Sequence, residues 1–184
     1  MDIIKKLKSV SNKNDFDNKF INIIFRVYND ENDDNTIKDC KYVKISKKLS
    51  IIPRNAFRHS KIKAVLFPNN VSVICQYAFS YCKSLKYIKL PNSLTYINNC
   101  AFDYCINIDC LKIPDSVIYI GKCAFRDCVE IKSISIPNSV RYIGSSCFTT
   151  YDNVKFIQIP LKFSNDLFMI FYHVSEDRTR IIYT

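Results

Sequence analysis

The sequence predicts an α/β solenoid of stacked repeats, with a parallel β-sheet on one face, short helical turns or loops on the other, and a cap at each end. Two observations predict it. An alternating apolar pattern recurs before each of five prolines, and those prolines recur at one interval of 23 residues: Pro68, Pro91, Pro114, Pro137 and Pro160. A fixed period of this length is the signature of stacked structural units.

Length and composition are consistent with one such domain. The chain has 184 residues, which corresponds to about one domain, and 48% of them are hydrophobic, which is enough for a sizeable core. The apolar residues are mainly Ile, Tyr, Phe, Val and Leu, several of which favour strands. Since there are only two glycines, we expect the turns to depend on Pro, Asn, Asp and Ser.

The N-terminal region lies outside the repeats. Residues 1–28 space their apolar side chains by three and four, which predicts one or two amphipathic helices. Residues 29–35 then form a polar acidic loop, whose spacing does not match a calcium-binding EF-hand loop. We therefore expect a helical cap and acidic loop over residues 1–39, the solenoid over residues 40–160, and a C-terminal cap over residues 161–184.

Six segments of the form LxxIxI predict the strands. Each ends in an apolar, polar, apolar alternation, as a strand with one buried face requires. The segments begin at Cys40, Ile62, Leu85, Ile108, Ile131 and Val154. They predict six strands.

The residues after each strand predict a turn and a return to the core. Proline cannot donate a ladder hydrogen bond, so strand pairing ends there. Pairs such as Asn92-Ser93 are expected to bond nearby backbone groups and stabilise the bend. Gly121 and Gly144 follow an apolar pair, which suggests a left-handed backbone position.

Each repeat then carries a phenylalanine, with a small residue three positions later. This spacing fits one turn of helix. In three repeats the small residue is Cys82, Cys105 or Cys128, and we expect these to form a buried column of reduced thiols.

After Pro160 the period is no longer evident. Residues 167–174 and 179–184 read as two short strands around a polar turn, although the first could equally be a short helix entered at Ser164. Either arrangement is expected to cover the open end of the stack.

Segments such as LKYIKLPNSLTYINNCAFDYC and IKSISIPNSVRYIGSSCF resemble the BspA-like leucine-rich repeats, whose units read LxxIxIPxSVxxIGxxAFxxC. The resemblance covers about residues 40–160. It implies that the LxxIxI segments form the parallel sheet of a curved leucine-rich-repeat solenoid, and that the protein acts in surface adhesion or protein–protein contact.

The outward residues of the predicted sheet form the candidate binding site. They stack into basic columns with aromatic interruptions, although nothing in the fold requires like charges to be neighbours. The candidate residues are Lys41, Lys44, Lys63, Lys86, Tyr87, Lys89, Lys112, Lys132, Lys155 and Phe156. An acidic protein partner is predicted, with a surface adhesin or a nucleic-acid-binding protein as alternatives; equally, the lysines could serve only solubility.

Other chemistry has little support in the sequence. The two histidines, His59 and His173, belong to no nucleophile motif, and no P-loop, G-x-G-x-x-G or CxxC pair is present. We therefore expect no enzymatic activity, cofactor or metal. A secretory signal and a membrane span are not evident, which favours a cytoplasmic location, with the cell surface as the alternative. A further column, Val73, Tyr96, Tyr119 and Tyr142, is expected to pack upon itself rather than to meet a partner.

Overall fold

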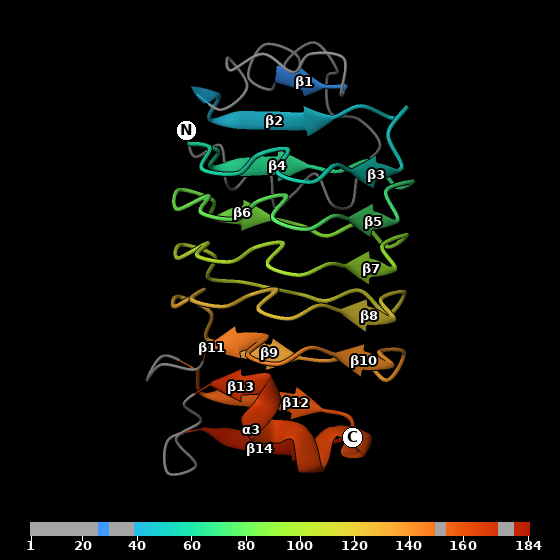
Figure 1. The fold of residues 1–184 in the computed structure, drawn as a ribbon, viewed down its shortest axis with the longest axis vertical. Coiled ribbons are helices and arrows are strands. Elements are labelled where there is room, and N and C mark those ends of the chain that lie inside the picture. Colours follow the sequence, from blue (N-terminus) through green and yellow to red (C-terminus); the bar gives the residue numbers. More distant parts are fainter. Residues whose placement is uncertain (1–25, 30–38, 150–153, 173–178) are drawn as a thin grey trace, which may run out of the picture.

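The computed structural model describes residues 26–29, 39–149, 154–172 and 179–184. Over these ranges the chain winds into a stack of similar coils along one long axis (Figure 1). Parallel strands join neighbouring coils, which confirms the predicted solenoid. In the described ranges no helix has the length and apolar character that a bilayer span requires.

The LxxIxI segments line one side of the stack, the first side. Its strands form two separate parallel sheets: β1 (Arg26–Tyr28), β2 (Tyr42–Ile45), β4 (Ala64–Leu66) and β6 (Tyr87–Ile88) in one, and β9 (Ser133–Ser135), β12 (Phe156–Ile159) and β14 (Arg180–Tyr183) in the other. Exposed and buried residues alternate along β12, with Ile157 and Ile159 buried. The same alternation is found in β2 and β9, so these three strands have one face in the core, as predicted.

The fourth LxxIxI segment, residues 108–113, forms no strand, so the prediction of six strands is wrong there. Its inward residues are buried as expected. However, within the described chain no backbone hydrogen bond joins residues 109–113 to a neighbouring coil. The segment carries Asp109 where the other five segments have lysine after the first apolar position, and aspartate is depleted in strands, which is one reason for the difference. The first side is consequently divided at this segment.

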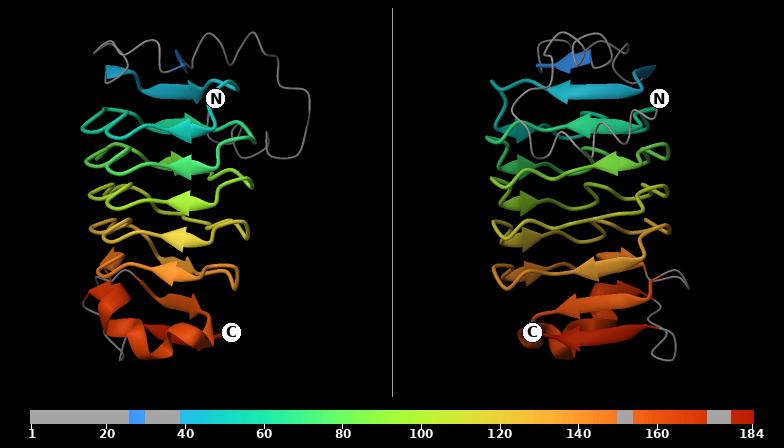
Figure 2. Two further views of the ribbon diagram at one scale, coloured as in Figure 1. Left: turned by 45° about the vertical axis from the view of Figure 1, so that its right-hand side comes forward. Right: turned by 180° about the vertical axis from the view of Figure 1, so that it is seen from behind.

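A second parallel sheet lies on another side of the coils. Its two-residue strands are β3 (Ile51–Ile52), β5 (Val73–Ile74), β7 (Tyr96–Ile97), β8 (Tyr119–Ile120) and β10 (Tyr142–Ile143), in the order β10-β8-β7-β5-β3. Figure 1 shows these strands one above another at the right of the stack, and the left view of Figure 2 turns this side forward. The repeat pattern does not predict this sheet, since two residues are too few to show a period of two.

The third side carries the phenylalanines on turns. Its inter-coil bonds run to the following coil: the N–H groups of Phe57, Phe79 and Phe102 donate to carbonyls 21 or 22 residues later, at 2.7, 2.8 and 2.8 Å. Positive φ angles lie two residues before and two residues after Phe57, Phe79, Phe102 and Phe125, so the predicted helical turn is wrong. Near the C-terminal end β11 (Phe148–Thr149) pairs with β13 (Phe171–Tyr172) on this side.

One column of aromatic rings runs through the core. Neighbouring rings stack with centroids 4.9 to 5.4 Å apart, and none is more than 1% exposed. The column consists of Phe57, Phe79, Phe102, Phe125, Phe148 and Phe171. Its last member follows Phe148 by 23 residues, so one feature of the repeat continues beyond Pro160.

The turn after each strand also connects coils. Leu94 donates its N–H to the carbonyl of Pro91 at 3.0 Å, and later repeats do the same. The serine of this turn was predicted to bond nearby backbone, and that prediction is wrong. It donates to a carbonyl 22 residues earlier, as Ser93 Oγ does to the Val71 carbonyl at 2.6 Å. These serines therefore hold adjacent coils together.

The two glycines are required by space and not by a left-handed backbone. Neither has a positive φ, so that prediction is wrong. A Cβ atom on Gly121 would lie 2.5 Å from the backbone nitrogen of Asn99 in the preceding coil. The left-handed positions come two residues later, at Cys123 and Ser146.

The N-terminal end of the stack begins with a strand. Residues 26–28 form β1, which pairs in parallel with β2, so the helix predicted up to residue 28 is wrong for these three residues. The Tyr28 ring meets the Phe57 ring edge-on with centroids 4.6 Å apart, and so covers that end of the phenylalanine column. Residues 1–25 and 30–38, which hold most of the predicted helix and acidic loop, lie outside the described residues.

The C-terminal end is built from a 3-10 helix, a short α-helix and strands. The 3-10 helix η2 (Leu161–Asp166) leads into α3 (Leu167–Ile170), which confirms the helical alternative for residues 167–170, while residues 171–172 form the strand β13. β14 confirms the second predicted strand and pairs with β12, placing Ile181 beside Ile157. Residues 161–184 therefore extend the stack by a further layer where they are described.

Candidate partner-binding face

The strand register brings the candidate residues into the expected columns. Tyr42 pairs with Ala64 and Ala64 with Tyr87, while Ser133 pairs with Phe156. We call the outward surface of the first side the lysine face. It is defined by the ten candidate residues: Lys41, Lys44, Lys63, Lys86, Tyr87, Lys89, Lys112, Lys132, Lys155 and Phe156.

Most of these side chains are accessible to a partner. Lys44 and Tyr87 are half-buried, and the other eight are exposed. Phe156 is 45% exposed, whereas the six phenylalanines of the core column are buried. The structure thus places the predicted residues on the surface, while their role in binding stays a prediction.

The division of the first side also divides the lysine face. The candidate residues from Lys41 to Lys89 lie on or beside the strands from β2 to β6, and those from Lys132 to Phe156 lie on or beside β9 and β12. Lys112 belongs to the unpaired segment between the two sheets. The face is therefore two basic areas separated at residues 108–113.

Acidic and aromatic groups modify the charge of the face. Lys86 Nζ lies 3.7 Å from Asp109 Oδ2, with both side chains more than 40% exposed, so solvent screens this pair. The same ammonium lies 5.9 Å from the Tyr87 ring centroid, and the Arg180 guanidinium lies 5.9 Å from that of Phe156. Sequence reasoning missed Arg180, because the period was not evident after Pro160.

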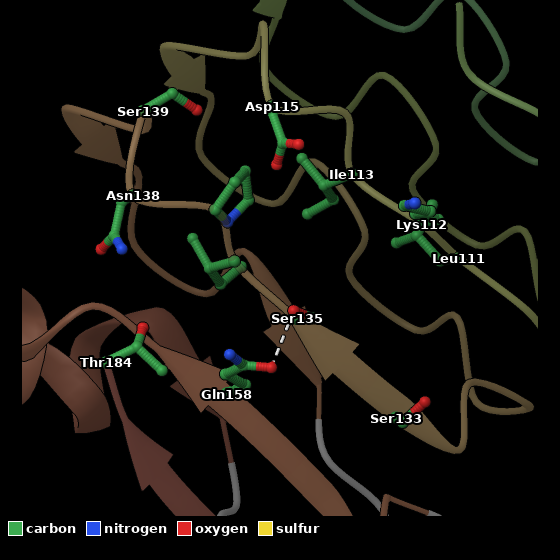
Figure 3. A pocket seen from close by; sticks show the side chains of 12 residues that line it. Leu111, Lys112, Ile113, Asp115, Ser133, Ser135, Asn138, Ser139, Gln158 and Thr184 are labelled. Carbon is green, nitrogen blue, oxygen red and sulfur yellow. Dashed lines mark hydrogen bonds between the residues drawn. The ribbon is translucent and has the colours of Figure 1, made fainter. Parts of the chain in front are cut away.

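A hollow of about 560 Å³ lies between the unpaired segment and β9. In Figure 3 the Ser135 and Gln158 side chains are joined by a hydrogen bond, from Ser135 Oγ to Gln158 Oε1 at 3.2 Å. The residues that line the hollow are Leu111, Lys112, Ile113, Asp115, Ser133, Ser135, Ile136, Pro137, Asn138, Ser139, Gln158 and Thr184. Its lining combines a few apolar side chains with hydroxyl and amide groups, one cation and one carboxylate.

The tyrosines of the second sheet stack on one another, as predicted. The Tyr119 and Tyr142 ring centroids are 4.9 Å apart at an interplanar angle of 10°, and the Tyr96 ring lies 6.0 Å from that of Tyr119. Tyr96 and Tyr142 remain 42% and 50% exposed. The column therefore stabilises the sheet and also forms part of the surface.

A second polar and aromatic cluster lies on the third side, and sequence reasoning missed it. His59 stacks on Tyr81 and Tyr81 on Tyr104, at 4.8 and 4.6 Å. Buried Asp103 accepts two hydrogen bonds from Arg126, at 2.8 and 2.9 Å, which raise the pKa of that guanidinium further above its already high value. The spacing of these residues by 22 and 23 positions could have revealed from the sequence that they lie in adjacent coils.

The predicted thiol column, Cys82, Cys105 and Cys128, is buried. Each thiol donates to the carbonyl of a core phenylalanine in an earlier coil, at 2.9, 3.1 and 3.2 Å. Burial raises the pKa of the Cys105 and Cys128 thiols, which keeps them protonated and unreactive. All nine cysteines lie in the described ranges and are free, and Cys110 alone among them is exposed.

The described residues contain no group of three or more His, Cys, Asp or Glu side chains that could hold a metal ion. His59 is in the aromatic stack of the third side, and His173 lies outside the described residues.

Comparison with known proteins gives a family match and several structural matches. A family model described as a BspA type leucine-rich repeat region matches six copies over residues 50–175. No curated protein matches the chain.

Two solved structures share the fold. A leucine-rich repeat protein of T. pallidum has 28% identity and a TM-score of 0.62, over 66% of this chain and 59% of that one. The pneumococcal vaccine antigen PcpA has 25% identity and a TM-score of 0.64, over 79% of this chain and 42% of that one. The chain thus spans about half the length of these proteins.

Proposed function

Because this chain belongs to the BspA-type leucine-rich-repeat family, we propose that it is a non-catalytic module that binds an acidic protein through its lysine face. Leucine-rich-repeat solenoids commonly use an extended surface of stacked strands for binding. The function of the family in protein contact is consistent with this proposal.

The observation that carries the proposal is the stacking of exposed lysines in register on the first side. Seven of the eight candidate lysines are exposed, and within the described chain the face supplies one acidic partner, Asp109. Neighbouring like charges repel, and a packed sheet does not need them. An acidic partner would relieve this repulsion and would be attracted over a distance of about 8 to 10 Å at physiological salt.

A charge-reversal experiment tests the proposal. Lys86, Lys89 and Lys132 are replaced together by Glu, and the control variant carries the same changes at three exposed lysines outside the face, Lys48, Lys83 and Lys122. Each replacement lowers the net charge by two, so both variants fall from +10 to +4. Their overall charge is equal, and only the position of the change differs.

The expected result is that affinity capture from the native cell recovers a partner with the parent chain and the control variant, but not with the face variant. Circular dichroism checks that all three chains are folded. If the face variant and the control variant recover the partner equally well, the location of the replaced lysines does not matter and the proposal is wrong.

Nucleic acid is distinguished from protein by a salt titration with a labelled single-stranded oligonucleotide. Binding through phosphates weakens steeply as salt rises, because counterions are released. If the affinity for the oligonucleotide depends steeply on salt, and only the face variant loses this binding, the partner is nucleic acid and not an acidic protein.

A cell-surface adhesin is a second candidate function. The observation that favours it is the structural likeness to the pneumococcal vaccine antigen. Brief protease treatment of intact cells tests this location: an adhesin would be cleaved, whereas a protein inside the cell would remain whole until lysis.

A further inference from the structure

The backbone of the unpaired segment lacks the hydrogen bonds that its neighbours make. Lys63 donates its N–H to the Lys41 carbonyl at 2.7 Å, Lys86 to Lys63 at 3.0 Å, and Lys155 to Lys132 at 2.9 Å. In the described part of the chain the two intervening donors of this series, at Asp109 and Lys132, have no such bond. Backbone N–H and C=O groups are strong hydrogen-bonding groups and require partners.

The missing bonds are confined to the first side. On the second sheet, Ile118 donates its N–H to Thr95 at 3.0 Å and Arg141 donates to Ile118 at 2.8 Å. On the third side, Tyr104 donates to Arg126 at 2.8 Å. Since two other ladders hold this coil in place, the unpaired segment is a local feature of an otherwise continuous stack.

The hollow lies at this gap, and its size and lining suit a short peptide segment. A volume of about 560 Å³ is in the range of small-ligand sites and far below that of a domain. Peptides commonly bind where a sheet presents unpaired backbone groups, because a second backbone repeats the same donors and acceptors at the same spacing. None of the lining residues is aromatic, so the lining offers no ring on which a sugar could stack.

The charges in the lining set a preference among peptides. Lys112 is the cation of the hollow, and Asp115 is its carboxylate. An acidic side chain is favoured beside Lys112, and a neutral hydroxyl or amide side chain beside Asp115, where a second carboxylate would be repelled. The remaining polar lining consists of serine, threonine and amide side chains, which can donate or accept.

We propose that the hollow is the peptide-recognition subsite of the lysine face. It takes an extended segment of the partner in which acidic and small polar residues alternate, and the backbone of that segment pairs with the unpaired groups of residues 111–113, which line the hollow. This inference rests on the proposed function, and it adds where on the face the partner is recognised and by which chemistry.

The test is a titration of the ¹⁵N-labelled full chain with the capped peptide acetyl-(Glu-Thr)₃-amide, followed by amide chemical shifts. Shifts are expected at residues 109–113 and 132–135, with smaller changes elsewhere on the face. The same peptide with alternate amides methylated should bind about fivefold more weakly for each hydrogen bond removed.

Ser133→Tyr provides a blocking variant. Ser133 pairs with Phe156, an exposed aromatic residue on the neighbouring strand, so the sheet accepts an aromatic side chain at this position, while the larger side chain fills the hollow. Leu66→Tyr is the matched control, because it adds the same side chain to the first side away from the hollow. The expected result is at least a tenfold loss of peptide binding in Ser133→Tyr and no loss in the control.

Three outcomes would overturn the inference: shifts spread evenly over all lysines, equal binding of the methylated peptide, or cellotriose producing the same local shifts in place of the peptide. Failure here is separable from failure of the proposed function. If the charge-reversed face loses its partner but Ser133→Tyr keeps it, only the subsite is wrong; if both variants keep it, the lysine face is not the binding surface.

Discussion

Replacing Phe102 by alanine is the most direct test of how this solenoid is held together. The ring is fully buried and stacks on Phe79 and Phe125 with centroid distances of 5.1 and 5.2 Å. Its removal leaves a cavity in the middle of the column, for which a loss of about 3 to 5 kcal/mol is expected. For a chain of this length, a loss of 1 kcal/mol lowers Tm by roughly 2 to 4 °C, so the expected decrease is on the order of 6 to 20 °C.

Urea denaturation followed by circular dichroism measures this loss. Phe168→Ala is the control, because Phe168 is 76% exposed and its truncation should change the free energy of unfolding by less than about 1 kcal/mol. Phe171→Ala adds a comparison of position: it removes an end member of the column, so it should loosen the C-terminal end more than it destabilises the whole stack. If Phe102→Ala is no more destabilising than Phe168→Ala, the stacked column does not stabilise the core as argued.

Three further predictions concern polar, thiol and glycine positions. Ser80→Ala should leave the free energy of unfolding unchanged or slightly raised, because the buried Ser80 Oγ has no hydrogen-bond partner among the described residues. Asp103→Ala should lower it by about 1 to 3 kcal/mol, because Arg126 loses two hydrogen bonds and keeps only the contact of 3.9 Å with Asp127; chemical denaturation measures both. A thiol reagent should label native Cys110 first, and mass spectrometry should find the thiol column unlabelled until unfolding. Because the pKa values of Cys105 and Cys128 are raised in the folded state, the free energy of unfolding should fall as pH rises above about 8.5, where the unfolded thiols ionise. Early labelling of the column, or a stability that does not change with pH, would contradict this. Gly121→Ala should cost about 1 to 3 kcal/mol by crowding the preceding coil, and an unchanged thermal midpoint would show that the coils separate easily there.

The period predicted most of the inward-facing residues. The columns of phenylalanine and cysteine, the alternation within β12 and the register of the lysine face follow from a 23-residue repeat, since each residue of one coil must lie over its equivalent in the next. The same reasoning predicted the stacked tyrosines of the second sheet. Positions that are buried in every repeat can be recognised in the sequence because the same residue type recurs at the same interval.

Local backbone conformation was less predictable. Gly121 suggested a left-handed position, but the left-handed residue is Cys123. Glycine is required at position 121 because the backbone of Asn99 in the preceding coil leaves no room for a Cβ atom. Residues 26–28 fit a helical spacing, yet they pair with β2 as a strand. In both cases a contact distant in sequence decided the conformation, and a local pattern does not record such contacts.

The repeat pattern alone was enough to predict the family, the solenoid and the exposure of the candidate lysines, because burial of one face of each repeat allows little other than stacking. The division of the face at residues 108–113, and the hollow there, became apparent only from the three-dimensional arrangement of the coils. The fourth segment has the same length and apolar spacing as the others, so its sequence pattern predicts a strand. Whether backbone groups of adjacent coils meet depends on their separation and alignment in space, and the pattern of side chains does not specify either.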